Sequence, residues 1–208
     1  MKRFKDYISL NEWKANNDNK SKIVAIPKTK EDLREIIAQR LNANIYNPDF
    51  TGIDTSKIKS MSHLFDNSED DVLRTKYKIN LCDTVCIDIS SWDTSNADNM
   101  EWMFGNCENV ERIIVNGLNT SKVERMNGMF YHCRNILKLD LSSFNVSKVN
   151  NMNYMFSECE YLNTINGISN WNVSDASFND NMHWMFYKVD KHFVRPTWYD
   201  ENKWERKL

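Results

Sequence analysis

The chain has 208 residues and a formal net charge of −2; 41% of its residues are hydrophobic, 12% aromatic and 27% charged. This near balance of charge excludes strong electrostatic attraction to a nucleic-acid backbone or an anionic membrane as the basis of function. The length suffices for one domain with a sizeable core, and the low content of glycine (5) and proline (3) argues against disorder or a flexible linker.

The amino-terminal stretch MKRFKDYISLNEWKANNDNK starts with basic residues but lacks the apolar run of a secretory signal. No part of the sequence approaches the roughly 20 apolar residues that a membrane-spanning helix needs. We therefore expect a cytoplasmic protein without a membrane segment. A surface location would require a leader that has been removed.

Residues 1–52 are predicted to form an N-terminal cap made of a strand and a helix. Residues 23–26, Ile-Val-Ala-Ile, have the composition of an edge strand, and Thr29-Lys-Glu-Asp32 is typical of a helix start with acidic residues in its first turn. The helix should extend to about Asn42 and pack one apolar face on the rest of the protein. That face consists of Leu33, Ile36, Ile37 and Leu41.

Residues 53–188 hold five copies of the phrase Met-x-x-Met-Phe, with Leu in place of the second Met in the first copy. The three central copies follow at an interval of 26 residues, whereas the outer intervals are 39 and 30. Regular spacing in the middle with insertions at the ends is typical of stacked repeats. The copies are Met61–Phe65, Met100–Phe104, Met126–Phe130, Met152–Phe156 and Met182–Phe186.

Each repeat has the same internal order. An Asx-x-Ser element such as Asp93-Thr-Ser95 suits a turn or a helix N-cap. The Met, Met and Phe at i, i+3 and i+4 then predict a short helix with one apolar stripe. Alternating apolar residues such as Ile113 and Val115 predict a short strand. We therefore expect an α/β solenoid of about five strand-turn-short-helix coils, in which equivalent Met and Phe side chains meet inside.

The stretches LDLSSFNVSKVNNMNYMF and SSWDTSNADNMEWMF resemble the mycoplasma-type DxSxVxxMxxMF repeats of BspA-like leucine-rich-repeat proteins, which occur in surface proteins and in leaderless proteins of bacteria and their phages. The resemblance covers about residues 53–186. It implies a leucine-rich-repeat-like solenoid and a role in binding or adhesion, usually to another protein. It implies no catalytic residue.

Residues 189–208 combine four aromatic residues with a polar background. Because stacked repeats expose apolar edges at both ends, we interpret this segment as a C-terminal cap, with a docking arm as the alternative. The aromatic residues are Phe193, Trp198, Tyr199 and Trp204.

Three cysteines, Cys107, Cys133 and Cys159, each follow a repeat Phe by three residues. Recurrence at the repeat interval predicts a ladder of buried thiols. Cys82 and Cys86 lack the second ligand pair of a structural zinc site. An odd cysteine count also fits a reducing compartment.

Catalytic chemistry finds little support in the sequence. His132 and Cys133 are neighbours whose side chains should diverge on a tight turn, and the carboxylates of residues 69–71 lie in a polar insertion that we expect to be solvated. Nucleophile-elbow, metalloprotease and phosphate-loop motifs are absent. We expect no enzyme activity, cofactor or metal.

Two surfaces are candidates for binding. The first is an aromatic edge formed by the residue two after the first Met of each phrase and by residues just after the Phe; the alternative is that these side chains fold over the seams between coils. The second is the outward side of the strands, at Asp88, Ile114, Asp140 and Asn166, flanked by Arg112, Lys138 and Thr164. The candidate residues are Trp102, Tyr131, His132, Tyr154, Trp184, Tyr187, Asp88 and Asp140.

These features favour a noncatalytic module that occupies the surface of a partner protein, encoded by a bacterium or a phage, and that is monomeric or self-associates weakly. The first alternative is a surface adhesin fragment that binds host protein or glycan. An enzyme and a piece that assembles end to end through its repeat edges are the others.

Overall fold

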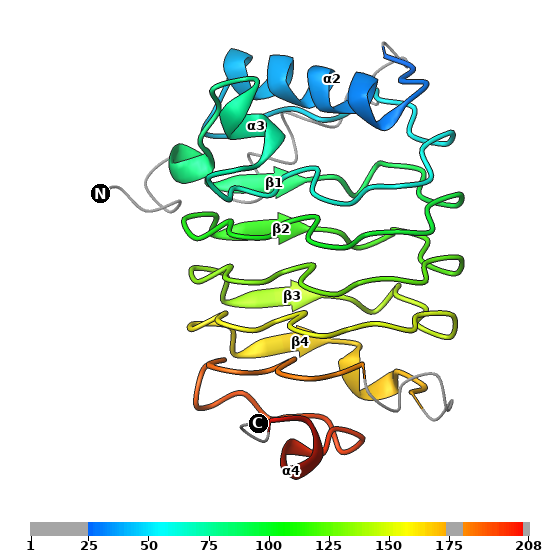
Figure 1. The fold of residues 1–208 in the computed structure, drawn as a ribbon, viewed down its shortest axis with the longest axis vertical. Coiled ribbons are helices and arrows are strands. Elements are labelled where there is room, and N and C mark those ends of the chain that lie inside the picture. The colour runs from blue at the N-terminus through cyan, green and yellow to red at the C-terminus, as the bar shows by residue number, and fades with distance from the viewer. Residues whose placement is uncertain (1–24, 174–180, 206–208) are drawn as a thin grey trace.

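The computed structural model describes residues 25–173 and 181–205 (Figure 1). The chain descends in successive coils, each running from one Asx-x-Ser turn to the next, between a helix at one end and the C-terminal segment at the other. The elements are α2 (Lys30–Ala43), α3 (Val72–Thr75), η2 (Leu81–Asp83), β1 (Cys86–Asp88), β2 (Arg112–Ile114), β3 (Lys138–Asp140), β4 (Thr164–Asn166), η3 (Ile168–Asn170) and α4 (Glu201–Trp204).

Helix α2 forms where the sequence predicts it. The Thr29 side chain accepts a hydrogen bond from the backbone N–H of Asp32, and Asp32 Oδ2 accepts one from the backbone of Thr29, which closes a capping box. Leu33, Ile37 and Leu41 are fully buried against the first coil. The helix therefore covers the end of the stack, as a cap must (Figure 1).

The predicted edge strand is only partly described. Ala25 forms a single parallel bridge with Ile53, and Ile26 is 57% exposed. Ile23 and Val24 lie outside the described residues.

The strands pair in parallel with a fixed register. Ile87 lies beside Ile113, and Leu139 lies beside Ile165, so that each pair is offset by one 26-residue repeat. Figure 1 shows β1 to β4 one below the next and pointing the same way. A second column of parallel bridges joins Ser60, Asn99, Arg125 and Asn151.

The prediction of a short helix in each repeat is wrong in the described residues: the Met-x-x-Met-Phe segments are tight turns. Their third residue has a left-handed backbone, as at Trp102 with φ 52°. Alternate N–H groups bond to the next coil instead of to the carbonyl four residues back; Met100 N donates to Arg125 O at 2.9 Å, and Phe104 N donates to Met129 O at 3.0 Å. The spacing of Met, Met and Phe at i, i+3 and i+4 therefore occurs here in a tight turn.

The repeat phenylalanines form a continuous ladder through the interior. The five rings are all 0% exposed. Successive centroids lie 5.5, 5.5, 5.7 and 5.5 Å apart, with interplanar angles of 10° or less. Burying a Phe contributes about 1.5–3 kcal/mol of transfer free energy. This ladder joins neighbouring coils by apolar packing, in addition to the backbone hydrogen bonds between them. Its members are Phe65, Phe104, Phe130, Phe156 and Phe186.

The predicted thiol ladder is confirmed. Cys107, Cys133 and Cys159 are at most 1% exposed, and each Sγ donates to the carbonyl oxygen of the Phe in the preceding coil at 3.0–3.1 Å. All five cysteines are free.

The C-terminal segment packs on the last coil. The Tyr199 ring meets Phe186 edge-on at 4.7 Å, and Phe193 lies 5.2 Å from the same ring. Trp184 N donates to Trp204 O at 3.0 Å. These contacts favour a cap over a docking arm. None of the described helices combines the length and apolarity needed to cross a bilayer.

Candidate binding groove

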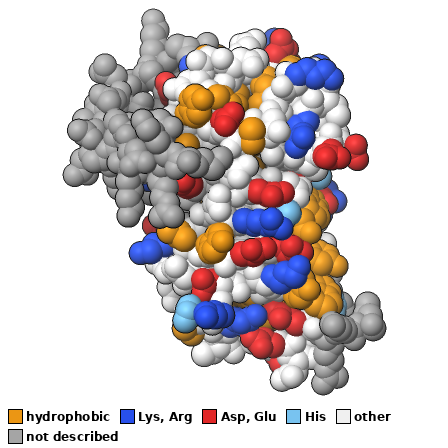
Figure 2. Space-filling view, turned by 90° about the vertical axis from the view of Figure 1, so that its left-hand side faces the viewer, with side chains coloured by type: hydrophobic (Ala, Val, Ile, Leu, Met, Phe, Trp, Pro, Cys, Tyr) orange, Lys and Arg blue, Asp and Glu red, His pale blue; other side chains and the backbone are white. Residues whose placement is uncertain are grey.

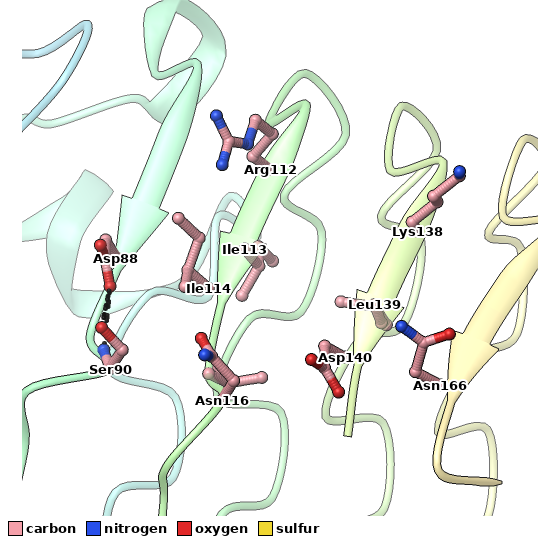
Figure 3. Close-up of a pocket in the computed structure, with 11 residues that line it drawn as sticks. Asp88, Ser90, Arg112, Ile113, Ile114, Asn116, Lys138, Leu139, Asp140 and Asn166 are labelled. Atoms are coloured by element: carbon pink, nitrogen blue, oxygen red, sulfur yellow. Dashed lines mark hydrogen bonds between the residues drawn. The ribbon is translucent and has the colours of Figure 1, made fainter. Parts of the chain in front are cut away.

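The outward side of the strands forms an open groove of about 440 Å³. Because side chains alternate along a strand, Ile113 and Leu139 point into the core while their neighbours point outward (Figure 3). The groove is lined by Asp88, Ser90, Arg112, Ile113, Ile114, Val115, Asn116, Lys138, Leu139, Asp140 and Asn166.

Charge is separated along the strands of the groove. Arg112 and Lys138 stand at the first residues of β2 and β3, whereas Asp88 and Asp140 stand at the last residues of β1 and β3. Figure 3 shows the cations toward one side and the carboxylates farther along the strands. Ile114 lies between the two carboxylates, one coil from each. The surface thus offers a basic row, an acidic row and an apolar contact between the carboxylates.

Both carboxylates are held in place by the turns that end their strands. Asp88 Oδ1 accepts hydrogen bonds from Ser90 N at 2.9 Å and Ser90 Oγ at 2.7 Å. Asp140 Oδ1 accepts from Ser142 N at 3.1 Å and Ser142 Oγ at 2.7 Å. The two carboxylates belong to two separate parallel pairs, β1–β2 and β3–β4, with β2 between their strands. They form a fixed pair of hydrogen-bond acceptors.

The strand positions of the groove were predicted from the sequence, whereas Ser90 and Asn116 were not. Ser90 follows the end of β1 by two residues, and Asn116 follows the end of β2 by two residues, so both continue the outward alternation beyond the strands. The alternation itself was the signal that could have found them.

The predicted aromatic edge is largely folded over the seams between coils. The Trp102 and Tyr131 rings meet edge-on at 5.0 Å, and Trp102 stacks on His63 at 6.5 Å. Trp184 and Tyr187 also meet edge-on at 5.0 Å, but within one coil. These side chains are partly buried. Tyr154, at 41% exposure, is the candidate aromatic that faces solvent most openly.

His132 belongs to a ladder of charges. Its Nδ1 lies 3.4 Å from Glu108 Oε1, and its Nε2 lies 3.9 Å from Glu158 Oε2. The Cys133 thiol is buried and donates to Phe104 O, so the two neighbours diverge as predicted. Figure 2 shows acidic and basic side chains interspersed down one flank of the molecule.

A comparison with protein families matches residues 73–198 to a family described as "Mycoplasma protein of unknown function, DUF285". No curated protein and no solved structure matches the chain.

Proposed function

This chain belongs to the DUF285 family of Mycoplasma proteins of unknown function, and on that premise we propose that it is a noncatalytic protein-binding module that acts by occupying a partner's surface. We further propose that its repeats are BspA-like and form a leucine-rich-repeat-like solenoid. The parallel pairing at the repeat interval and the phenylalanine ladder support this architecture.

The groove on the strand face is the observation that carries the proposal. Its rows of opposite charge, two residues apart on β3 at Lys138 and Asp140, suit a polypeptide that presents acidic and basic side chains on its two edges. Partly buried Ile114 adds an apolar contact at the centre, where interface energy concentrates. Charged groups in such a surface contribute mainly to partner choice and association rate.

The lining of the groove gives binding groups and no nucleophile with a base. It contains neither histidine nor cysteine, and its Ser90 hydroxyl donates to Asp88. The Ser90 hydroxyl thus orients the Asp88 carboxylate. These features favour recognition over group transfer.

A photo-cross-linking amino acid at Asn116, inside the groove, tests the proposal in the native host. The same probe at exposed Lys148, outside the groove, is the matched control. We expect the Asn116 probe to capture one discrete, protease-sensitive partner that the Lys148 probe does not capture. Equal capture from both positions, or a product that resists proteases and yields to glycosidases, would contradict a protein-binding groove.

A further inference from the structure

Three potential metal ligands converge where the cap meets the first coil. One donor atom from each of His63, Asp66 and Asp71 lies within 4.8 Å of the other two. His63 is the left-handed third residue of the first repeat phrase, Asp66 directly follows its Phe, and Asp71 is the N-cap of α3. The 39-residue spacing to the second phrase supplies the segment that carries Asp71 into this position.

The expectation that residues 69–71 are solvated holds for Glu69 and Asp70 but is wrong for Asp71. Asp71 is only 7% exposed, because its cap to the N–H of Leu73 at 2.8 Å turns it toward the first coil. Asp66 is 4% exposed.

Neighbouring groups hold one oxygen of each carboxylate. Asp66 Oδ1 accepts from Ser68 N and from Asn106 Nδ2, each at 3.0 Å, while Asp66 Oδ2 faces His63 Nδ1 at 2.8 Å. Such outer contacts orient ligands in metal sites. One oxygen of each carboxylate is therefore oriented by protein groups.

The direct ion-pair partner of Asp66 among the described residues is His63, a member of the same cluster. Among the described residues, no lysine or arginine forms an ion pair with Asp66 or Asp71. Lys30 and Arg34 of α2 act on Asp71 at longer range, and the Lys30 ammonium donates to Ser62 Oγ at 2.7 Å. Buried charges of this kind are neutralised by protons, partners or metal ions.

We propose that His63, Asp66 and Asp71 bind a divalent transition-metal ion of the Zn²⁺ class, which clamps the α3 insertion to the first coil. One imidazole nitrogen with two carboxylates favours Zn²⁺ over Mg²⁺ or Ca²⁺, which prefer all-oxygen sites. The 39% exposed His63 side chain provides the entry path. Ligand atoms around tetrahedral zinc lie about 3.3 Å apart. His63 Nδ1 and Asp66 Oδ2, now 2.8 Å apart, would separate by about half an ångström, and the Asp71 oxygen, which lies within 4.8 Å of both, would approach them by up to about 1.5 Å.

Calorimetric titration of the full chain, stripped with chelator, against ZnCl₂ and MgCl₂ tests this site. Asp71→Asn keeps an N-cap oxygen, and His63→Asn keeps a residue that tolerates the left-handed backbone, so both variants should fold. His192→Gln, an exposed histidine elsewhere, and Cys82→Ser, the partly exposed thiol, are the controls.

We expect one equivalent of Zn²⁺ to bind and to raise the melting temperature, with at least tenfold weaker binding in Asp71→Asn and His63→Asn and no change in the controls. The Co²⁺ form should show no thiolate charge-transfer band. Absence of Zn²⁺ binding at micromolar concentration, unchanged affinity in both site variants, or loss of binding in Cys82→Ser would overturn the site.

Discussion

Trp102 lies directly over Gly128: a Cβ placed on Gly128 would be 2.6 Å from Cδ2 of the indole. The third residue of each repeat phrase has a left-handed backbone. It is Gly128 in the third copy and a bulky residue in the others, namely His63, Trp102, Tyr154 and Trp184. The small residue in one coil therefore accommodates the large ring of the coil before it. The seam between these coils depends on this complementarity.

Gly128→Ala should lower the free energy of unfolding by about 1–3 kcal/mol, because the added methyl group meets an indole that cannot withdraw without disturbing Tyr131. Urea unfolding followed by circular dichroism measures the loss. In a Trp102→Ala background the same change should cost at least about 1 kcal/mol less, since the two sites are coupled. Equal costs in both backgrounds would show that backbone strain alone is responsible.

Phe130→Ala should destabilise the protein by about 3–5 kcal/mol, since it removes the central ring of the phenylalanine ladder and leaves a cavity. Tyr161→Ala, at a position 54% exposed, is the control and should change stability by less than about 0.5 kcal/mol. A loss below about 1 kcal/mol for Phe130→Ala would contradict the buried ladder.

The five thiols should differ sharply in reactivity. Burial raises the pKa of Cys86 to about 12, and it raises the pKa of Cys133 and Cys159 as well. At pH 8 a thiol with pKa 12 is thiolate in only about one part in 10⁴, and the ladder thiols are also inaccessible. Iodoacetamide labelling with mass spectrometry should find Cys82 modified first and the others only after unfolding. Early labelling of Cys133 would contradict the packing.

Lys30 should make stability rise with pH in the alkaline range. Burial, with repulsion from Arg34 as a lesser cause, lowers the pKa of Lys30 to about 8 from 10.5. Between these values the unfolded chain binds a proton that the folded chain has lost, so this group's contribution to stability increases from pH 8 to 10.5. Lys30→Met should therefore gain less than the wild type between about pH 7.5 and about pH 9.5 in urea melts. Identical pH dependence of the two proteins would refute the assignment.

The local sequence patterns predicted the strands and the core correctly, but they predicted short helices where the structure has tight turns. Period-two alternation around Ile113 and Leu139 sufficed to predict β2 and β3, because one face of each strand must be buried. The i, i+3, i+4 spacing of Met and Phe fits both a helix and a tight turn. A left-handed backbone at Trp102 and Tyr154 makes these segments turns. Because Trp and Tyr have no preference for that conformation, their presence does not predict it.

One of the two candidate sites could be predicted from the sequence and the other could not. The strand face with Asp88 and Asp140 could be predicted because equivalent strand positions recur at the repeat interval. The cluster of His63 with Asp71 could not, since it joins a repeat turn to an insertion that has no counterpart in the central repeats. Only the folded cap and insertion bring these side chains together.

The charge-swapped variant Lys138→Asp with Asp140→Lys tests the binding groove most directly, because it exchanges the two rows on β3 while keeping the net charge. Calorimetric titration with the partner captured at Asn116 should show at least tenfold weaker affinity for this variant, and unchanged affinity for Tyr154→Ala on the aromatic edge. Full affinity in the charge-swapped protein, together with a loss in Tyr154→Ala, would contradict the strand face as the binding surface.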